Sequence, residues 1–383
     1  MHIYLDNNAT TKPLDGVVEA MLPFLGSEYA NPSSVHRFGQ RVRHKVERAR
    51  EQVARLINAE PREIVFTSGG TESLNLAIRG VLAAEPARRH VITSAVEHSA
   101  VHRLATQLVR EGYRVDRIGV DRQGRLDYDE LEDRVTPDTA LISIMHANNE
   151  TGVLFDVLRI CEIAARHGVR VHVDAVQSVG KVPVDVKELP VHLLSLSAHK
   201  MHGPKGIGAL YVRRRTRLVP LTIGGRQERD LRPGTENVTA IVGFGVAAEE
   251  AAYLPAGRIE AIRQLRDDFE SRVLEAIPIA HVIGVEADRL CNTSNIGFER
   301  LQAEAILILL SERGVSASAG AACSSGSLEP SHVLAGMGVD PHVAHGAIRF
   351  SLSRFTTVAE IDRTIEILSE VVDRLSATMP RHS

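Results

Sequence analysis

The chain has 383 residues, of which 44% are hydrophobic and 24% charged, a composition typical of a globular protein with one or two domains. Its formal net charge of −3 gives no reason to expect nucleic acid or an anionic membrane as a partner. No apolar run approaches the roughly 18 residues that a membrane span needs. Because the N-terminus lacks a signal-peptide layout and three widely spaced cysteines imply no disulfide framework, we expect a cytoplasmic protein.

The first sixty residues predict a short apolar start followed by helices. Residues 3–11 run from apolar side chains into a polar turn, and helical signals dominate from Pro13. A loop at 31–34 precedes a long helix at 40–58, in which basic residues surround an apolar stripe. We interpret the basic residues as a solvated face, with an RNA-facing surface as the alternative.

Strand and helix patterns alternate through the middle of the chain. Short apolar runs at 63–67, 90–94, 114–118, 140–145, 169–174 and 193–197 predict strands. Helical patterns lie between them at 71–82, 98–111, 128–135 and 156–167. Strands separated by helices of this length indicate βαβ units and a mostly parallel sheet covered on both faces.

The order changes after a strand at 207–213 and a helix at 238–253, with a boundary at 254–257. We therefore expect a large domain at 13–255 and a small domain built from 1–12 and 256–383. The small domain is predicted to hold a long helix from 258, a strand at 295–298 and a helix from 302. A loop of small residues at 316–327, a strand at 347–352 and a final helix at 358–377 complete it.

Lys200 follows directly after the apolar run at 193–197, beside Ser197 and His199. A lysine at the end of a buried strand, next to a hydroxyl and an imidazole, can form a Schiff base with a carbonyl cofactor. A lysine in a solvated turn is the alternative. The stretches at the other strand ends favour the first interpretation.

The strand at 63–67 runs into Ser68-Gly-Gly-Thr71, where a tight glycine turn opens a helix. Glycines let the backbone approach an anion, and the free N–H groups with the helix dipole favour phosphate. An ordinary turn between a strand and a helix is the alternative.

Three further strand ends carry polar side chains that suit a flat cofactor ring. Asp174, with Gln177 three residues later, can keep a pyridine nitrogen protonated. The amides of 146–152, Asn149 among them, suit a cofactor hydroxyl or a substrate carboxylate. His98 can stack on a ring and move protons. A turn-capping Asp174 and ordinary loop polarity are the alternatives, but the joint occurrence with Lys200 favours a pyridoxal-type site.

Cys323 lies in the loop of small, uncharged residues, whereas the helical surroundings of Cys161 predict core packing. A thiol on such a loop can reach a substrate, and forming the thiolate at pH 7 costs only about 2 kcal/mol. A structural cysteine is the alternative. His342 and His345 have a spacing that suits a metal, but no third ligand is evident, so no metal is expected.

Together these stretches resemble the cysteine desulfurases of the NifS/IscS type, which are class V aminotransferase-like, fold-type I enzymes that use pyridoxal phosphate. The resemblance runs nearly end to end, through 4–11, 31–36, 66–73, 97–98, 146–152, 172–178, 197–200, 234–237, 323–330 and 348–352. It implies an α/β fold with a mostly parallel central sheet in an αβα large domain, plus a smaller α+β domain.

The resemblance also implies catalytic roles. Lys200 would bind pyridoxal 5'-phosphate covalently and later move the substrate's Cα proton. Asp174 would pair with the pyridine nitrogen, Gln177 would lie at the ring hydroxyl, and His98 would stack on the ring as an acid or base. Cys323 would attack the substrate sulfur and keep it as a persulfide while alanine leaves.

Binding roles follow from the same resemblance. The phosphate would be held by Gly70, Thr71, Ser197 and His199, joined by Thr235 from the neighbouring subunit of a homodimer. Asn149, next to the cofactor, and Arg349 would receive the substrate carboxylate.

The sequence thus predicts a cysteine desulfurase that converts L-cysteine to L-alanine and delivers sulfur to an acceptor protein, such as an iron–sulfur scaffold, or to thio-modification. Selenocysteine lyase, which shares this machinery, is the alternative within the enzyme class. An inactive subunit that only scaffolds sulfur transfer is an alternative of another class. The presence of Lys200, Asp174, His98 and Cys323 together argues against that second alternative.

Overall fold

The computed structural model describes residues 2–319 and 331–377, so the prediction for Cys323 lies outside the described residues. Of the loop predicted at 316–327 only 316–319 is described, and there the loop prediction is wrong, because Ser316 ends one short strand and Ser318–Ala319 form another. Within these ranges no helix combines the length and the apolar character that crossing a bilayer would require.

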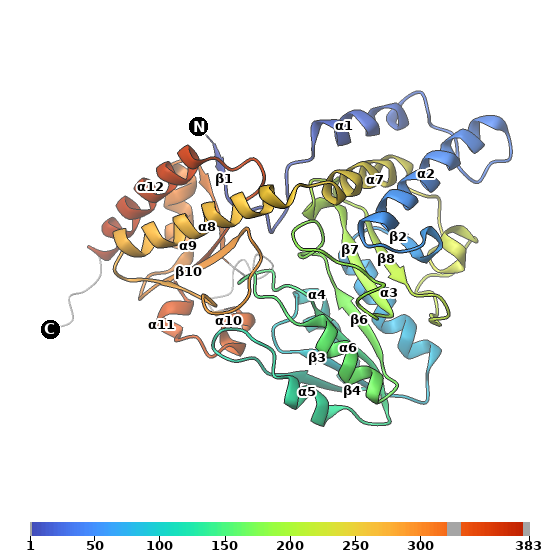
Figure 1. Cartoon of the computed structure of the whole chain (residues 1–383), viewed down its shortest axis with the longest axis horizontal. Helices are drawn as coiled ribbons and strands as arrows, with labels where there is room; N and C mark the ends of the chain where they lie inside the picture. The colour runs from blue at the N-terminus through green and yellow to red at the C-terminus, as the bar shows by residue number, and fades with distance from the viewer. Residues whose placement is uncertain (1, 320–330, 378–383) are drawn as a thin grey trace.

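A seven-stranded sheet forms the centre of the larger part of the molecule (Figure 1). Only β8 runs antiparallel to its neighbours, so the predicted mostly parallel sheet is confirmed. The strands are buried on both faces and correspondingly apolar; all seven residues of β5 are buried. In sheet order the strands are β2 (Ile64–Thr67), β8 (Gly208–Val212), β7 (Leu193–Ser197), β6 (Arg170–Asp174), β5 (Thr139–Met145), β3 (His90–Ser94) and β4 (Arg114–Ile118).

Helices cover both faces of this sheet. The chain alternates between the strands and α3 (Gly70–Ala84), α4 (Ser99–Arg110), α5 (Tyr128–Arg134) and α6 (Val157–Arg166). Of these, α3 and α4 pack on one face, and α5 and α6 pack on the other. The face of α5 and α6 is also covered by α1 (Asp15–Met21), α2 (Arg37–Leu56) and α7 (Val238–Ala252), which pack on one another. Short 3-10 turns lie at Leu22–Leu25, Pro61–Glu63, Ala198–Lys200 and Gln227–Asp230.

A second, antiparallel sheet lies beside the first, at the left of Figure 1. Its order is β12 (Ser318–Ala319), β13 (Ala347–Ser351), β10 (Thr293–Phe298) and β9 (Ala280–Val282). Near it, β1 (Ile3–Tyr4) pairs in parallel with β11 (Val315–Ser316). The surrounding helices are α8 (Ala256–Ala276), α9 (Ala303–Glu312), α10 (His332–Gly336), α11 (Pro341–Ala344) and α12 (Val358–Ser376).

The second sheet has its own apolar core. Phe269 of α8 meets Phe350 of β13 edge to face, with 5.1 Å between ring centroids, and Phe298 is fully buried beside them. Ile3 and Leu5 from the start of the chain belong to the same cluster. The N-terminal segment therefore packs with the C-terminal part of the chain.

Most predicted elements of the sheet and its helices are confirmed to within a few residues. The helix expected from residue 40 begins earlier, at Arg37, because the His36 imidazole accepts the Gly39 N–H and caps it. The strand expected at 295–298 begins two residues earlier, at Thr293. The strands β1, β9, β11 and β12 were not predicted, since two or three residues carry no periodic signal.

Candidate active site

The predicted site residues of the large sheet gather at its carboxyl edge. Because β3, β5, β6 and β7 are parallel, His98, Asn149, Asp174 and Lys200 all follow strand ends on the same side. β7 ends at Ser197, and a single 3-10 turn, Ala198–Lys200, then presents the lysine. The arrangement matches the edge at which open α/β sheets bind ligands.

The Lys200 amine is buried and held by the N-terminal segment. Its Nζ donates to the backbone carbonyl of Asn8 at 2.5 Å and to that of Ala9 at 2.9 Å. Burial lowers the pKa of Lys200 to about 7, assisted by the positive charges of Arg349 and Lys181. Near neutral pH a large fraction of this amine is therefore unprotonated and nucleophilic, as Schiff-base chemistry requires.

Asp174 and Gln177 lie close to this lysine. The Asp174 side chain accepts the Val176 N–H at 3.0 Å. Burial raises the pKa of this carboxyl to about 6, although the hydrogen bond from Val176 and the charge of Lys200 both lower it. A cationic ring nitrogen placed beside it would favour its ionised form. The Gln177 side chain donates to the Asn8 carbonyl at 2.9 Å, the same oxygen that receives Lys200 Nζ.

His98 caps α4 and is neutral. Its Nδ1 accepts the Ala100 N–H at 3.2 Å, which leaves the ring proton on Nε2. Burial, followed by the charge of Lys200, lowers the pKa of His98 to about 4. A neutral imidazole with its Nε2–H free of the cap bond can stack on a ring and exchange a proton with it.

The glycine turn before α3 is built to accept an anion. No side chain caps the first turn of α3, so its N–H groups are available at the positive end of the helix dipole. The buried Ser197 Oγ has no hydrogen-bond partner among the described residues. A Cβ on Gly70 would lie 3.1 Å from Val176 Cγ2 and 3.8 Å from Ser197 Cβ, so these residues border one space. The His199 Nδ1 lies 3.2 Å from Thr10 Oγ1, and Thr71 is the second residue of α3.

Arg349 enters from the second sheet. Its Nη2 donates to Asp6 Oδ1 at 2.8 Å and its Nη1 to the Asn149 carbonyl at 3.0 Å. In the described ranges Arg349 Nε and Asn149 Oδ1 are buried without partners. A buried guanidinium with an unused N–H next to an unused amide oxygen suits a ligand that both accepts and donates, as an amino acid does.

Thr235 is the one predicted site residue among the described residues that lies away from this cluster. It is exposed on the loop after the turn Gln227–Asp230, and the prediction that it serves a neighbouring subunit is not tested by one chain. His342 and His345 lie at α11, and the described residues contain no group of three side chains able to hold a metal.

Three side chains of the site had no role assigned from the sequence: Asp6, which is partly buried, and Asn8 and Glu97, which are buried. Glu97 is fully buried; its Oε1 accepts the Ser94 hydroxyl at 2.6 Å and the Met145 N–H at 3.0 Å. Burial raises the pKa of Glu97 to about 8, so the carboxyl beside His98 is mainly neutral at pH 7. The signal for all three was only their place inside segments that carry the family resemblance.

The comparisons with known proteins agree with this geometry. The family model described as "Aminotransferase class-V" matches residues 3–364. The chain therefore belongs to the class-V aminotransferase family, whose fold it shares.

Its relatives narrow this class. The chain is 52% identical over 378 residues to a cysteine desulfurase of Nostoc sp., covering 99% of this chain and 94% of that protein. It is 49% identical to the cysteine desulfurase NifS of Azotobacter vinelandii, with the same coverage. A solved NifS-like protein superposes with a TM-score of 0.92 at 38% identity, covering 98% of this chain and all of the other. A structure titled "SspA in complex with cysteine" superposes with a TM-score of 0.83 at 36% identity, over 93% of this chain and all of that one. Within the family, the chain belongs to the cysteine desulfurases of the NifS type.

Proposed function

We propose that this enzyme uses pyridoxal 5'-phosphate to convert L-cysteine to L-alanine and keeps the sulfur on Cys323 as a persulfide. The observation that carries the proposal is the Lys200 amine, whose pKa is lowered to about 7. It lies at the same edge of the sheet as Asp174, the glycine turn before α3 and the buried Ser197 hydroxyl, which has no hydrogen-bond partner among the described residues. When bound, pyridoxal phosphate supplies an electron sink for the negative charge that develops at the substrate Cα.

The chain's own residues would bind and orient the cofactor. The α3 N-terminus (Gly70, Thr71) and Ser197 would hold the phosphate, with His199 beside them. Ionised Asp174 would face the ring nitrogen and keep that nitrogen protonated. Gln177 would lie at the ring hydroxyl, and His98 would lie against the face of the ring.

Arg349 and Asn149 would fix the substrate carboxylate, which places the substrate Cα hydrogen within the range of Lys200. An amine with a pKa near 7 can accept that proton and return it at the pH of the cell. His98, neutral above about pH 4, would donate or accept a proton at Nε2.

Cys323 is proposed as the sulfur acceptor. Burial raises the pKa of the Cys161 thiol to about 12, and it also raises that of Cys291, so neither of the two described cysteines is a good nucleophile. Attack of the Cys323 thiolate on the substrate sulfur forms an S–S bond as the substrate C–S bond breaks. The remaining three carbons leave as L-alanine after protonation, and a sulfur-acceptor protein or an external thiol then takes the persulfide sulfur.

The enzyme is further proposed to act as a homodimer in a reducing cytoplasm. Large apolar side chains are exposed at Leu25, Tyr29, Val35 and Ile223, which suits an interface with a second copy. Thr235, on the loop that follows Ile223, would then reach the phosphate of the neighbouring subunit. A reducing compartment keeps the thiol of Cys323 free.

Incubation of the purified enzyme with L-cysteine, pyridoxal phosphate and dithiothreitol tests the activity. Sulfide and alanine should appear in equal amounts, and their absence would refute the proposal.

Two variants separate the proposed roles. Lys200→Ala should lose the absorbance of the covalently bound cofactor and all turnover. Cys323→Ala should keep the absorbance but release no sulfide. Matched turnover in Cys323→Ala and in the unchanged enzyme would show that another group takes the sulfur.

A further inference from the structure

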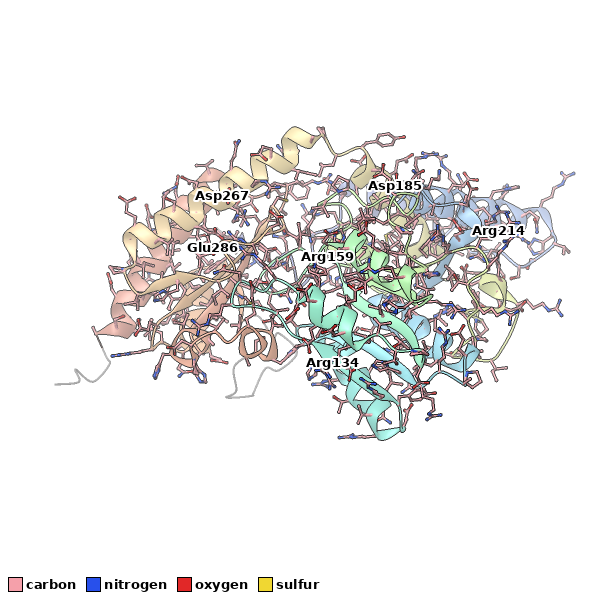
Figure 2. All side chains as sticks on the ribbon, turned by 60° about the horizontal axis from the view of Figure 1, so that its bottom comes forward. Arg134, Arg159, Asp185, Arg214, Asp267 and Glu286 are labelled. Atoms are coloured by element: carbon pink, nitrogen blue, oxygen red, sulfur yellow. The ribbon has the colours of Figure 1, made fainter. Side chains whose placement is uncertain are left out.

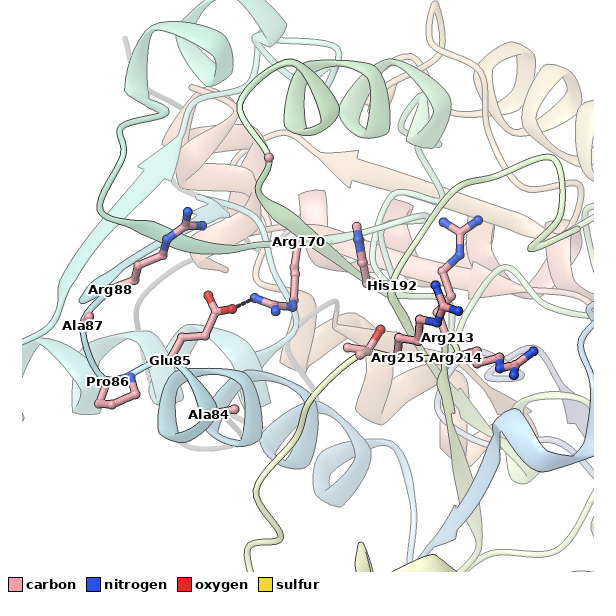
Figure 3. Close-up of a pocket in the computed structure, with 12 residues that line it drawn as sticks. Ala84, Glu85, Pro86, Ala87, Arg88, Arg170, His192, Arg213, Arg214 and Arg215 are labelled. Carbon is pink, nitrogen blue, oxygen red and sulfur yellow. Dashed lines mark hydrogen bonds and ion pairs between the residues drawn. The ribbon is translucent and has the colours of Figure 1, made fainter.

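A pocket of about 690 Å³ lies at the end of the large sheet opposite Lys200. Arg170 begins β6, His192 directly precedes β7, and the antiparallel β8 brings Arg213 to the same edge. The end of α3 and the residues after it complete the wall, from Ala84 to Arg88 (Figure 3). The full length of the strands separates this pocket from Asp174 and Lys200, which lie at the opposite strand ends.

Five arginines and one carboxylate line the pocket: Arg88, Arg170, Arg213, Arg214, Arg215 and Glu85. Figure 3 shows the ion pair of Glu85 with Arg170 on one side of His192 and the three consecutive arginines on the other. Across the described part of the chain, the guanidinium groups of these three arginines form no hydrogen bond or ion pair. The nearby Glu63 carboxylate accepts the backbone N–H of Arg214 instead.

His192 adds a neutral donor to the pocket. Its Nδ1 accepts the Val171 N–H at 3.1 Å, so its proton is on Nε2. Burial, then Arg213 and Arg170, lowers the pKa of His192 to about 4, which keeps the ring uncharged at pH 7. The positive charge of the pocket therefore comes from the arginines alone.

The positive charge of the arginines is larger than is needed to neutralise the negative ends of the neighbouring helices. The carboxyl ends of α3 and α6 point to this edge, and each carries roughly half a negative charge. Together with Glu85, and with the Glu63 carboxylate beside Arg214, they amount to about three negative charges, against five arginines. About two positive charges remain without a counterpart, in a protein whose formal net charge is −3.

We propose that this pocket binds a small polyanion that carries two adjacent phosphate groups. Its volume lies within the range of small-molecule sites, and planar guanidinium groups bind phosphate oxygens in pairs. The concave shape and the confinement of the charge to one pocket favour a small ligand over a nucleic acid, which needs an extended basic surface.

Calorimetric titration of the cofactor-loaded enzyme with sodium pyrophosphate, at constant ionic strength, tests this site. We expect saturable binding that is weakened at least about tenfold by Arg213→Gln, since each charged hydrogen bond is worth that much. Arg214→Gln is the second variant; the Arg214 side chain, labelled in Figure 2, is exposed, so its replacement leaves the packing of the fold unchanged. Orthophosphate should bind at least about tenfold more weakly than pyrophosphate.

Arg217→Gln is the matched control, because Arg217 is exposed in the same segment but does not line the pocket. It should change the affinity less than about twofold, as expected for a screened surface charge. Absence of saturable binding, or equal affinity in the Arg213→Gln and Arg217→Gln variants, would overturn the proposal. Competitive inhibition of L-cysteine turnover by pyrophosphate would also overturn it, because that places the anion at Arg349.

Discussion

The guanidinium of Arg349 is bonded on two sides, to the Asp6 carboxylate and to the Asn149 carbonyl, and its Nε–H is the group left without a partner in the described chain. The Asp6 side chain is only 20% exposed, so its charge is weakly screened. We therefore propose that Asp6 is a positioning residue, which would fix the plane in which Arg349 receives the substrate carboxylate.

Asp6→Asn should raise the KM for L-cysteine about tenfold while kcat changes less than about threefold. A charge-assisted hydrogen bond is worth 1.5–3 kcal/mol, and about 1.4 kcal/mol is a factor of ten. Steady-state kinetics measure the effect, and Asp6→Glu should restore part of it. Glu370→Gln, which removes an exposed ion pair with Arg313, is the control for loss of one charge. An unchanged KM would show that Asp6 does not position Arg349.

Lys200 gives a pH prediction. An ordinary lysine with a pKa of 10.5 is protonated throughout the neutral range, whereas Lys200, with its pKa lowered to about 7, becomes a neutral nucleophile as the pH rises through 7. The rate of covalent cofactor attachment to the apoenzyme should therefore rise between about pH 6 and 8 and then level off. Stopped-flow absorbance measures it, and the ratio to the rate with Nα-acetyl-lysine removes the cofactor's own titration. A ratio that stays constant from pH 6 to 10 would contradict a lowered pKa.

At the scale of the elements, the backbone at the start of β8 lies very close to the backbone of the turn that begins α3. A Cβ on Gly208 would lie 2.7 Å from the Gly69 carbonyl carbon and 2.7 Å from the Leu196 oxygen. All of these neighbours are backbone atoms, so none can turn aside as a side chain can. The glycine at the start of β8 thus lets the glycine turn that precedes α3 pack against the sheet.

Gly208→Ala should lower the free energy of unfolding by about 1–3 kcal/mol, the usual cost of an overpacked contact, and should weaken cofactor retention. Urea unfolding and cofactor release during dialysis measure the two effects. Gly257→Ala is the matched control, because a Cβ there meets nothing within 4 Å and lies in the first turn of α8. Equal stability of the two variants would mean that the backbone around Gly208 adjusts freely.

At the scale of the molecule, the division into 13–255 and 1–12 with 256–383 stays a prediction. The shared core of Ile3 and Leu5 with Phe269 supports it. The later segment is not fully separate, because Val333 and Ala344 belong to the core of the large sheet. We propose two domains with one extensive contact, and Arg349 crosses that contact to reach Asn149.

Ile223→Asp should weaken the proposed homodimer and, with it, cofactor binding. Ile223 is 96% exposed in the single chain, so a charge there has little effect on the fold but is costly if a second subunit buries it. Sedimentation velocity over a range of concentrations measures the dissociation. Val285→Asp, at a position that is 53% exposed elsewhere on the surface, is the control. A dimer equally stable in both variants would exclude Ile223 from the interface.

Local pattern was enough to predict the large sheet and the strand ends that carry His98, Asp174 and Lys200. Apolar runs of strand length and helices between them are read from neighbouring residues, and parallel strands must place their carboxyl ends together. The pKa values were beyond reach, because they depend on burial and on charges from other elements, as the effect of Arg349 on Lys200 shows.

By itself, then, the sequence determined the alternating order of strands and helices, the lysine at the end of β7 and, through its motifs, the family. Only the tertiary structure decided which groups hold that lysine and the arginine across from it. Lys200 bonds to Asn8, 192 residues away, and Arg349 bonds to Asp6, 343 residues away. Such contacts carry no periodic signal, because they form only when the N-terminal segment packs between the two sheets.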